Sequence, residues 1–445
     1  MFMKGSFDLN KTTKSIIKIV IALFVFVISF NTRSFGAHCE NIVVVIDPGH
    51  GGDSLGGNYE DRIERDINLI TAFAMRDRLE QYDGVDVYVT RENNTDKEMT
   101  RKERFDFAKK VNADFLFSIH YNMSEYHTLF GSEVWIPSKG NNYVLGYQFA
   151  TIEMKALTEL GLFDRGIKNK LDKNKSGEYY GILKYSEEYD IPAVIIEHCH
   201  LDEERDSAFW NEEAYKRFGV TDADCVAKFF KLSSQSLGID NSTFENIAVS
   251  KPTGRADRDY TDPEYCDITV DDAGEQATNV TVHVKAADWD NYIQYYQYSV
   301  DGGNTFSRLE AWDDRSSEEQ IFDLDKTQGY DMDIIVRTLN KYDLYTQSES
   351  VHVAGLPLPE IEEDITESES VPDRQYDTVE IKTNKEKSSE KDFPPIYVFL
   401  VTLIVLFITF NILFAVSVSR KKKRKRRKKA VKKPVDDEFD LDILE

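Results

Sequence analysis

Cysteine is scarce in this chain, and positive charge is scarce over most of its length. Only Cys39, Cys199, Cys225 and Cys266 occur among 445 residues, and no two of them have Cys-x-x-Cys spacing. The sequence therefore offers no Cys-x-x-Cys motif for metal binding or thiol redox chemistry. Some of the four could still pair as disulfides in an exported protein, although spacing alone does not give their connectivity.

The charge of the chain is unevenly distributed around a formal net value of −24. The first 37 residues sum to +4 and the last 26 to +6, which leaves −34 on residues 38–419. Because phosphate contacts need clustered Lys and Arg side chains, we expect no nucleic-acid partner for this acidic part.

The N-terminal pattern is typical of an exported protein. Four lysines, at positions 4, 11, 14 and 18, precede or enter the apolar run 19–30, and small residues follow at 34, 36 and 37. Residues 1–37 are therefore predicted to be a secretory signal peptide, with an uncleaved N-terminal anchor as the alternative. The length of the remaining chain predicts two or three folded units with connecting segments.

The C-terminal region reads as a membrane anchor. Residues 396–419 carry no charged side chain and are long enough to cross a bilayer as a helix, so we predict a transmembrane helix over 394–419. Ten consecutive basic residues, Arg420 to Lys429, follow it. Basic flanks stay on the cytoplasmic side, which places the tail 420–445 inside the cell, near anionic lipid headgroups. The rest of the chain is then extracellular, at the cell membrane and facing the cell wall.

The first folded unit is expected to be an α/β domain over residues 38–240. Buried apolar runs of strand length alternate with helical patterns, which indicates a mostly parallel sheet. The expected strands are 42–46, 85–89, 115–119, 132–136 and 193–196, and the expected helices lie near 67–74, 101–110 and 147–160.

A second, smaller unit is expected over residues 246–355. Hydrophobic residues there alternate with period two, as in Thr281-Val-His-Val284, and Asp301-Gly-Gly303 reads as a turn. This pattern favours a small all-β sandwich of the immunoglobulin-like kind. Residues 356–393 are rich in Glu, Asp, Ser, Thr and Lys and are predicted to be a disordered acidic stalk.

Four ionisable residues of the α/β unit stand at predicted strand ends or at a helix start: His50, Glu64, His120 and Glu197. Positions after the carboxyl ends of parallel strands converge on one crevice, so these residues can meet in space. Two neutral imidazoles and one carboxylate form the ligand set of a catalytic zinc. The remaining carboxylate is suited to accept the proton of an attacking water and return it to a leaving amine. Spacing alone does not decide which carboxylate has which role.

The motifs around these residues resemble those of the zinc-dependent N-acetylmuramoyl-L-alanine amidases of the amidase 3 type, over about residues 42–232. Order and spacing both agree. The matching stretches are Val45-Ile-Asp-Pro-Gly-His-Gly-Gly52, Glu64-Arg-Asp-Ile-Asn-Leu69, Thr90-Arg91, Arg104 with Ala108, Phe117-Ser-Ile-His-Tyr-Asn122, Gly131-Ser-Glu-Val-Trp135, Asp164-Arg-Gly-Ile-Lys168 and Ile191-Pro-Ala-Val-Ile-Ile-Glu197.

The resemblance implies a function and a role for each of the four residues. His50, Glu64 and His120 would bind Zn²⁺, and Glu197 would be the catalytic acid/base. The substrate would be peptidoglycan, cut at the amide between N-acetylmuramic acid and the L-alanine of the stem peptide. The departures from the family pattern are Tyr121 and the run His198-Cys-His200, where the family more often has small or apolar residues.

The roles of four further residues and two further functions stay open at this stage. Asp47 and Asn122 are candidates for orienting a ligand histidine or contacting substrate, with turn formation as the alternative. His198 and His200 could form a His-x-His metal pair, line the groove or pack at the strand end. A non-catalytic peptidoglycan-binding or sensing protein on the same fold, or a zinc peptidase for another stem-peptide bond, would share these features. The sequence does not identify an activating protein partner.

Overall fold

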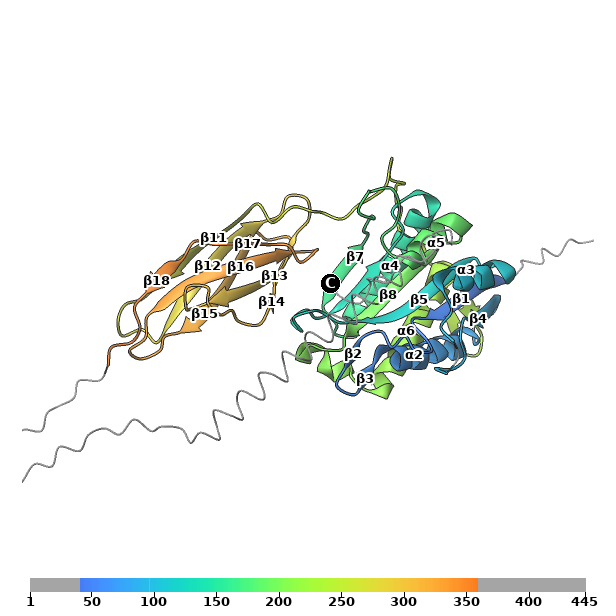
Figure 1. The fold of residues 1–445 in the computed structure, drawn as a ribbon, viewed down its shortest axis with the longest axis horizontal. Helices are drawn as coiled ribbons and strands as arrows, with labels where there is room; N and C mark the ends of the chain where they lie inside the picture. Colours follow the sequence, from blue (N-terminus) through green and yellow to red (C-terminus); the bar gives the residue numbers. More distant parts are fainter. Residues whose placement is uncertain (1–40, 96, 359–445) are drawn as a thin grey trace, which may run out of the picture. The chain divides into compact units, whose positions relative to one another are not determined.

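The computed structural model describes residues 41–95 and 97–358 (Figure 1). Four predicted segments therefore lie wholly or almost wholly outside the described residues: the signal peptide or anchor 1–37, the stalk 356–393, the transmembrane helix 394–419 and the tail 420–445. Within the described ranges, no helix combines the length and apolarity needed to cross a membrane.

The first domain is built on a six-stranded sheet with the order β4-β1-β5-β8-β6-β7. Neighbouring strands are parallel except β6, which runs antiparallel to β8, so the predicted mostly parallel sheet is confirmed. The strands are β1 Ile42–Pro48, β4 Val85–Val89, β5 Phe115–Asn122, β6 Ser132–Trp135, β7 Asp164–Lys168 and β8 Ala193–His200.

Helices cover both faces of this sheet, which explains why its central strands are apolar on both sides. Val44 and Ile46 of β1 share one core with α2, α4 and α6, whereas Val45 faces a second core with α3 and α5. The helices are α2 Glu64–Leu79, α3 Arg101–Lys110, α4 Gly140–Glu159, α5 Gly181–Tyr189 and α6 Glu212–Phe229.

The structure differs from the sequence prediction at several elements. Helix α4 begins at Gly140, seven residues before the predicted start, and neither β7 nor α5 was predicted. The sequence of β7 looks too polar for a strand, but Arg165 and Lys168 are buried there because both pair with Glu133. Strands β5 and β8 also extend past their predicted ends, so His120 and Glu197 lie within strands rather than after them.

The second domain consists of two antiparallel sheets, which confirms the all-β prediction. One sheet has the order β11-β12-β15 and the other β14-β13-β16-β17, with β18 paired to β16. Val282 and Ile334 are among the side chains from the two sheets that share one core. The strands are β11 Tyr265–Asp271, β12 Asn279–Ala287, β13 Ile293–Ser299, β14 Glu310–Ala311, β15 Glu319–Asp325, β16 Met332–Asn340, β17 Tyr345–Gln347 and β18 Val351–Val353.

The segment that precedes β11 binds to the first domain. The backbone N–H of Ala256 donates to the carbonyl of Ser138 at 2.7 Å, and the Arg255 guanidinium pairs with Glu187. The strands of the second domain thus begin at Tyr265, whereas the sequence prediction started this unit at 246. Residues 246–264 contain no strand, and their hydrogen bonds go to the α/β domain, to turns and, near residue 264, to the second domain.

Candidate metal centre

His50 lies in the turn that follows β1. Its backbone is left-handed, with φ of 63°, a conformation that is uncommon for a residue with a side chain. Arg104 stabilises the turn, because its guanidinium donates a hydrogen bond to the carbonyl of His50 at 2.8 Å. Arg91 in the same way donates to the carbonyl of Gly49 at 2.9 Å. These two arginines fix the path of the turn and so aim the His50 ring.

Glu64 is the first residue of α2, and the small hairpin β2–β3 (Asn58–Tyr59, Arg62–Ile63) leads into it. One carboxylate oxygen accepts the backbone N–H of Gly57 at 2.7 Å, and the other accepts that of Tyr121 at 3.2 Å. Only 6 % of the side chain is exposed. A buried carboxylate held by two backbone donors at a helix start is fixed in position rather than free in solvent.

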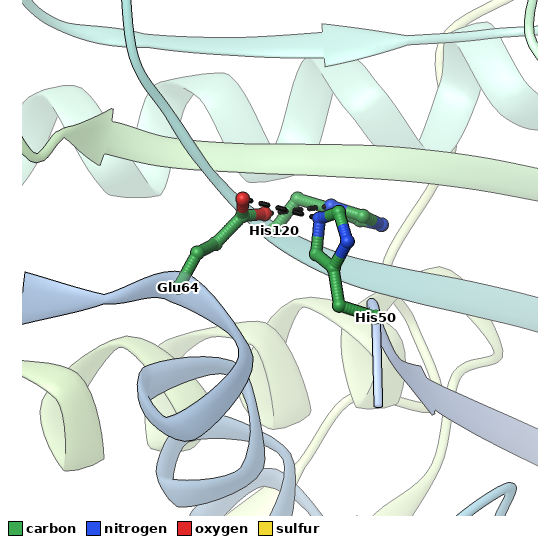
Figure 2. A group of neighbouring side chains, drawn as sticks. All are labelled: His50, Glu64 and His120. Atoms are coloured by element: carbon green, nitrogen blue, oxygen red, sulfur yellow. Dashed lines mark hydrogen bonds and ion pairs between the residues drawn. The ribbon is translucent and has the colours of Figure 1, made fainter. Parts of the chain in front are cut away.

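His50, Glu64 and His120 come together although they are up to 70 residues apart in the sequence (Figure 2). Glu64 lies between the two rings, with Oε2 3.1 Å from His50 Nε2 and Oε1 2.8 Å from His120 Nδ1. One ligand atom from each residue lies within 4.8 Å of the others. Within the described residues, these three side chains form a cluster whose ligand atoms are close enough together to hold a metal ion.

The protonation of the three groups reflects their mutual contact. Burial raises the pKa of the Glu64 carboxyl, but the two histidines outweigh burial and hold that pKa well below its usual value. Burial lowers the pKa of His50, yet the Glu64 carboxylate more than compensates and the pKa is raised. For His120, burial outweighs Glu64 and the pKa is lowered. A charged Glu64 and a neutral His120 are the forms that bind a cation.

Glu197 lies on the strand next to His120. In the parallel pair of β5 and β8, His120 is in register with Glu197, so their side chains leave the same face of the sheet about 5 Å apart at the backbone. Burial, followed by the charges of Glu64 and Glu133, raises the pKa of the Glu197 carboxyl well above its usual value. Its Oε2 is buried and has no hydrogen-bond partner among the described residues. The carboxyl thus has one oxygen without a partner in the described structure and is able to hold a proton.

Comparison with known proteins agrees with this arrangement. Residues 44–226 match the sequence model of the amidase 3 family, described as N-acetylmuramoyl-L-alanine amidase. This segment is an amidase 3 domain. The family expected from the motifs is therefore confirmed, and the matched segment contains all four candidate residues.

Individual relatives each match part of the chain. The amidase LytC of Bacillus subtilis is 28 % identical over 176 residues, which is 39 % of this chain and 32 % of LytC. The amidase AmiC of Escherichia coli O6:H1 is 27 % identical over 203 residues, 37 % of this chain and 47 % of AmiC. This chain therefore spans less than half the length of these two relatives. A crystal structure of an N-acetylmuramoyl-L-alanine amidase from Clostridium difficile 630 is 26 % identical, with a TM-score of 0.37, over 43 % of this chain and 97 % of that one.

Asp47 and Asn122 lie near the His50–Glu64–His120 group without contacting its three side chains. Asp47 is 1 % exposed and binds Thr90, Ser118 and Arg104, so it acts on His50 through Arg104 rather than by touching an imidazole. Asn122 donates to Glu133 at 3.0 Å and accepts the N–H of Met123. Neither side chain hydrogen-bonds to His50, Glu64 or His120 in the described structure.

Glu133 is the site residue that sequence reasoning missed. It lies on β6 in register with Glu197 and is 3 % exposed. Burial raises its pKa, but Lys168 and Arg165, at 2.7 and 2.8 Å, outweigh burial and keep the carboxyl ionised. The sequence feature that could have revealed Glu133 is its charge within the otherwise uncharged strand Ser132–Trp135. Its partners could not be identified because β7, which carries them, was not predicted.

Gly49 gives a test of how tightly the site is packed. A Cβ added there would overlap the His120 imidazole, and the φ of Gly49 is not in the left-handed region. We expect Gly49→Ala to displace the ring and weaken metal binding by at least about tenfold, the effect of disturbing a residue that orients a ligand. The matched control is Gly254→Ala, which has open space around the added methyl group. Equal zinc affinities in the two variants, measured by competition with a chromophoric chelator, would contradict this packing.

Proposed function

We propose that this protein is a zinc-dependent N-acetylmuramoyl-L-alanine amidase of peptidoglycan. The observation that carries the proposal is the placement of Glu197 beside the His50–Glu64–His120 group, within a segment that matches the amidase 3 family. The scissile bond is the amide between the lactyl group of N-acetylmuramic acid and the L-alanine of the stem peptide.

The three grouped side chains fit a zinc ion. Two imidazoles and one carboxylate are the donors of many catalytic zinc sites, which leave one position open. Donor atoms about 2.1 Å from a shared ion lie about 3–4 Å apart, so the present spacing of at most 4.8 Å needs only small side-chain shifts. When bound, the ion would supply Lewis-acid chemistry toward the lactyl carbonyl and the attacking water.

Glu197 moves the proton in this proposal. Its carboxylate accepts a proton from the attacking water and then donates it to the departing alanine nitrogen. A carboxyl with an ordinary pKa would release that proton near neutral pH. Burial and the neighbouring charges of Glu64 and Glu133 raise the pKa of Glu197, so the carboxyl can hold the proton until the amine leaves.

Glu133 and its two cations form the far wall beside Glu197. The carboxylate of Glu133 is shared by Arg165 and Lys168, so it cannot rotate toward Glu197 and compete for the same proton. It also fixes Asn122, two residues after His120. Glu133 therefore stays a charged neighbour of Glu197, in register with it on the next strand.

The proposed location follows from the sequence outside the described residues. The apolar run 396–419 and the basic run Arg420 to Lys429 would anchor the protein in the cell membrane with the amidase domain facing the cell wall. The full chain should then stay with membranes during alkaline carbonate extraction, and a chain ending at residue 393 should be released. Release of the full chain under the same conditions would contradict the anchor.

Mass spectrometry of digested peptidoglycan tests the activity. The full chain should release stem peptides with a free L-alanine amine and leave unsubstituted lactyl groups on the glycan. New termini at a bond within the stem peptide would instead indicate a peptidase. Binding to peptidoglycan without any new termini would favour a sensor on the same fold.

A further inference from the structure

His198, directly after Glu197, points away from the reaction space into the core under α6. The side chain is 0 % exposed. Its Nδ1 lies 3.0 Å from the carbonyl oxygen of His120, and its Nε2 lies 3.1 and 3.0 Å from the two carboxylate oxygens of Asp222. Because a carbonyl only accepts, Nδ1 carries the hydrogen of the first contact. The imidazole thus connects helix α6 to the backbone of a metal-ligand residue.

Asp222 lies in the same core and contacts Nε2 of the His198 ring. It lies on α6 with a fully buried side chain, and Glu153 of α4 is its buried neighbour. Burial, together with the charge of Asp222, raises the pKa of Glu153, so Glu153 keeps its proton. Asp222 faces His198 with both of its carboxyl oxygens. A buried polar group without a partner would be costly, and His198 is the partner that the fold supplies.

Tyr121 links the same ring to Glu64. The Tyr121 ring stacks on His198 with centroids 5.1 Å apart and an angle of 29° between the planes. Its hydroxyl is 2.6 Å from Thr71 of α2, and its backbone N–H donates to Glu64. His198 therefore contacts the backbone carbonyl of His120 and the side-chain ring of Tyr121, the residue whose backbone N–H holds the Glu64 carboxylate.

The strand pairing is irregular at this point. The register between β5 and β8 shifts between His120 and Asn122. A bulge changes the direction of the side chains around it. At such a point the regular strand hydrogen bonds no longer fix where those side chains point. A side chain that binds the His120 carbonyl supplies the missing constraint on the backbone.

We propose that His198 and Asp222 form a positioning pair that sets the backbone of His120 and Tyr121, and so aims His120 and Glu64 at the metal. This rests on the metal-binding part of the proposed function.

Variants of His198 separate positioning from simple packing. The amide N–H₂ of Asn can occupy the place of Nδ1 and donate to the His120 carbonyl, whereas that of Gln reaches the place of Nε2. We expect His198→Ala and His198→Gln to weaken zinc binding by about 10- to 100-fold, as other residues that orient metal ligands do. His198→Asn should retain zinc affinity within a few-fold of wild type. The control is Val226→Ala, one turn along α6 and also fully buried, which should lower the Tm without changing zinc affinity.

The full chain is measured in two ways: zinc affinity by chelator competition, and the visible absorption spectrum after loading with Co²⁺. The spectrum reports ligand geometry and should change in the Ala and Gln variants but not in Val226→Ala. If His198→Ala does not fold, the comparison of His198→Asn with His198→Gln tests the positioning role. Unchanged affinity and spectrum in a folded Gln variant, or an equal loss in Val226→Ala, would overturn the positioning role. Failure of wild type to bind either metal would instead reject the metal site itself.

Discussion

Glu197→Gln should lower the rate of amide cleavage by about 10²- to 10⁴-fold while leaving the metal bound, because glutamine can neither accept nor donate the transferred proton. The substitution keeps the size of the side chain, and Glu197 makes no ion pair with the residues that the structure describes, so its loss should not disturb the fold. Removing the carboxyl also removes a costly buried acid, so stability should not fall. Initial rates on purified peptidoglycan and metal content per chain are the two measurements.

The control for this variant is Glu159→Gln, the same chemical change on the exposed end of α4. There the carboxylate is 65 % exposed, and its ion-pair partner among the described residues is Lys155. It should leave both rate and metal content unchanged. A Glu197→Gln protein that cleaves at the wild-type rate would remove Glu197 from the mechanism. One that loses metal and activity together would make Glu197 a ligand rather than the acid/base.

His120→Ala should lose the metal first and the activity as a consequence. Only His50 and Glu64 would remain as protein ligands, and a ligand contributes more than the residues that orient it, so zinc affinity should fall more than about a hundredfold. Activity should return only at zinc concentrations high enough to refill the weakened site.

A matched histidine change separates this loss from general effects of mutation. His283→Ala, on β12 of the second domain, removes a partly exposed imidazole paired only with Asp271. It should bind zinc as wild type does. If His120→Ala also retained wild-type affinity, the His50–Glu64–His120 group would not be the metal site.

The sequence predicted the fold where burial alone determines the pattern. Strands β1 and β5 are continuous apolar runs because helices cover both sides of the sheet, and Thr100 begins α3 with a capping box that ends at Glu103. Strand β7 was missed because its polarity is compensated by a partner on another strand. The alternation of apolar residues does not reveal such a pair, since Arg165 and Glu133 are 32 residues apart.

The sequence predicted the candidate ligands and the candidate acid/base, but not the residues that hold them in position. Motif resemblance pointed to His50, Glu64, His120 and Glu197, and the structure brings the first three together with Glu197 on the next strand. The roles of Arg104 and His198 depend on contacts with backbone carbonyls, which no side-chain pattern encodes. His198 was open to a metal-ligand, groove-lining or packing interpretation, and its buried position in the structure agrees with packing.

A zinc titration of the metal-free full chain, with products identified by mass spectrometry, tests the central claim most directly. Stem peptides with a free L-alanine amine should appear in proportion to bound zinc and reach a plateau at one zinc per chain. Cleavage of that bond by fully metal-free protein, or saturation with zinc without any release of L-alanine termini, would contradict the account.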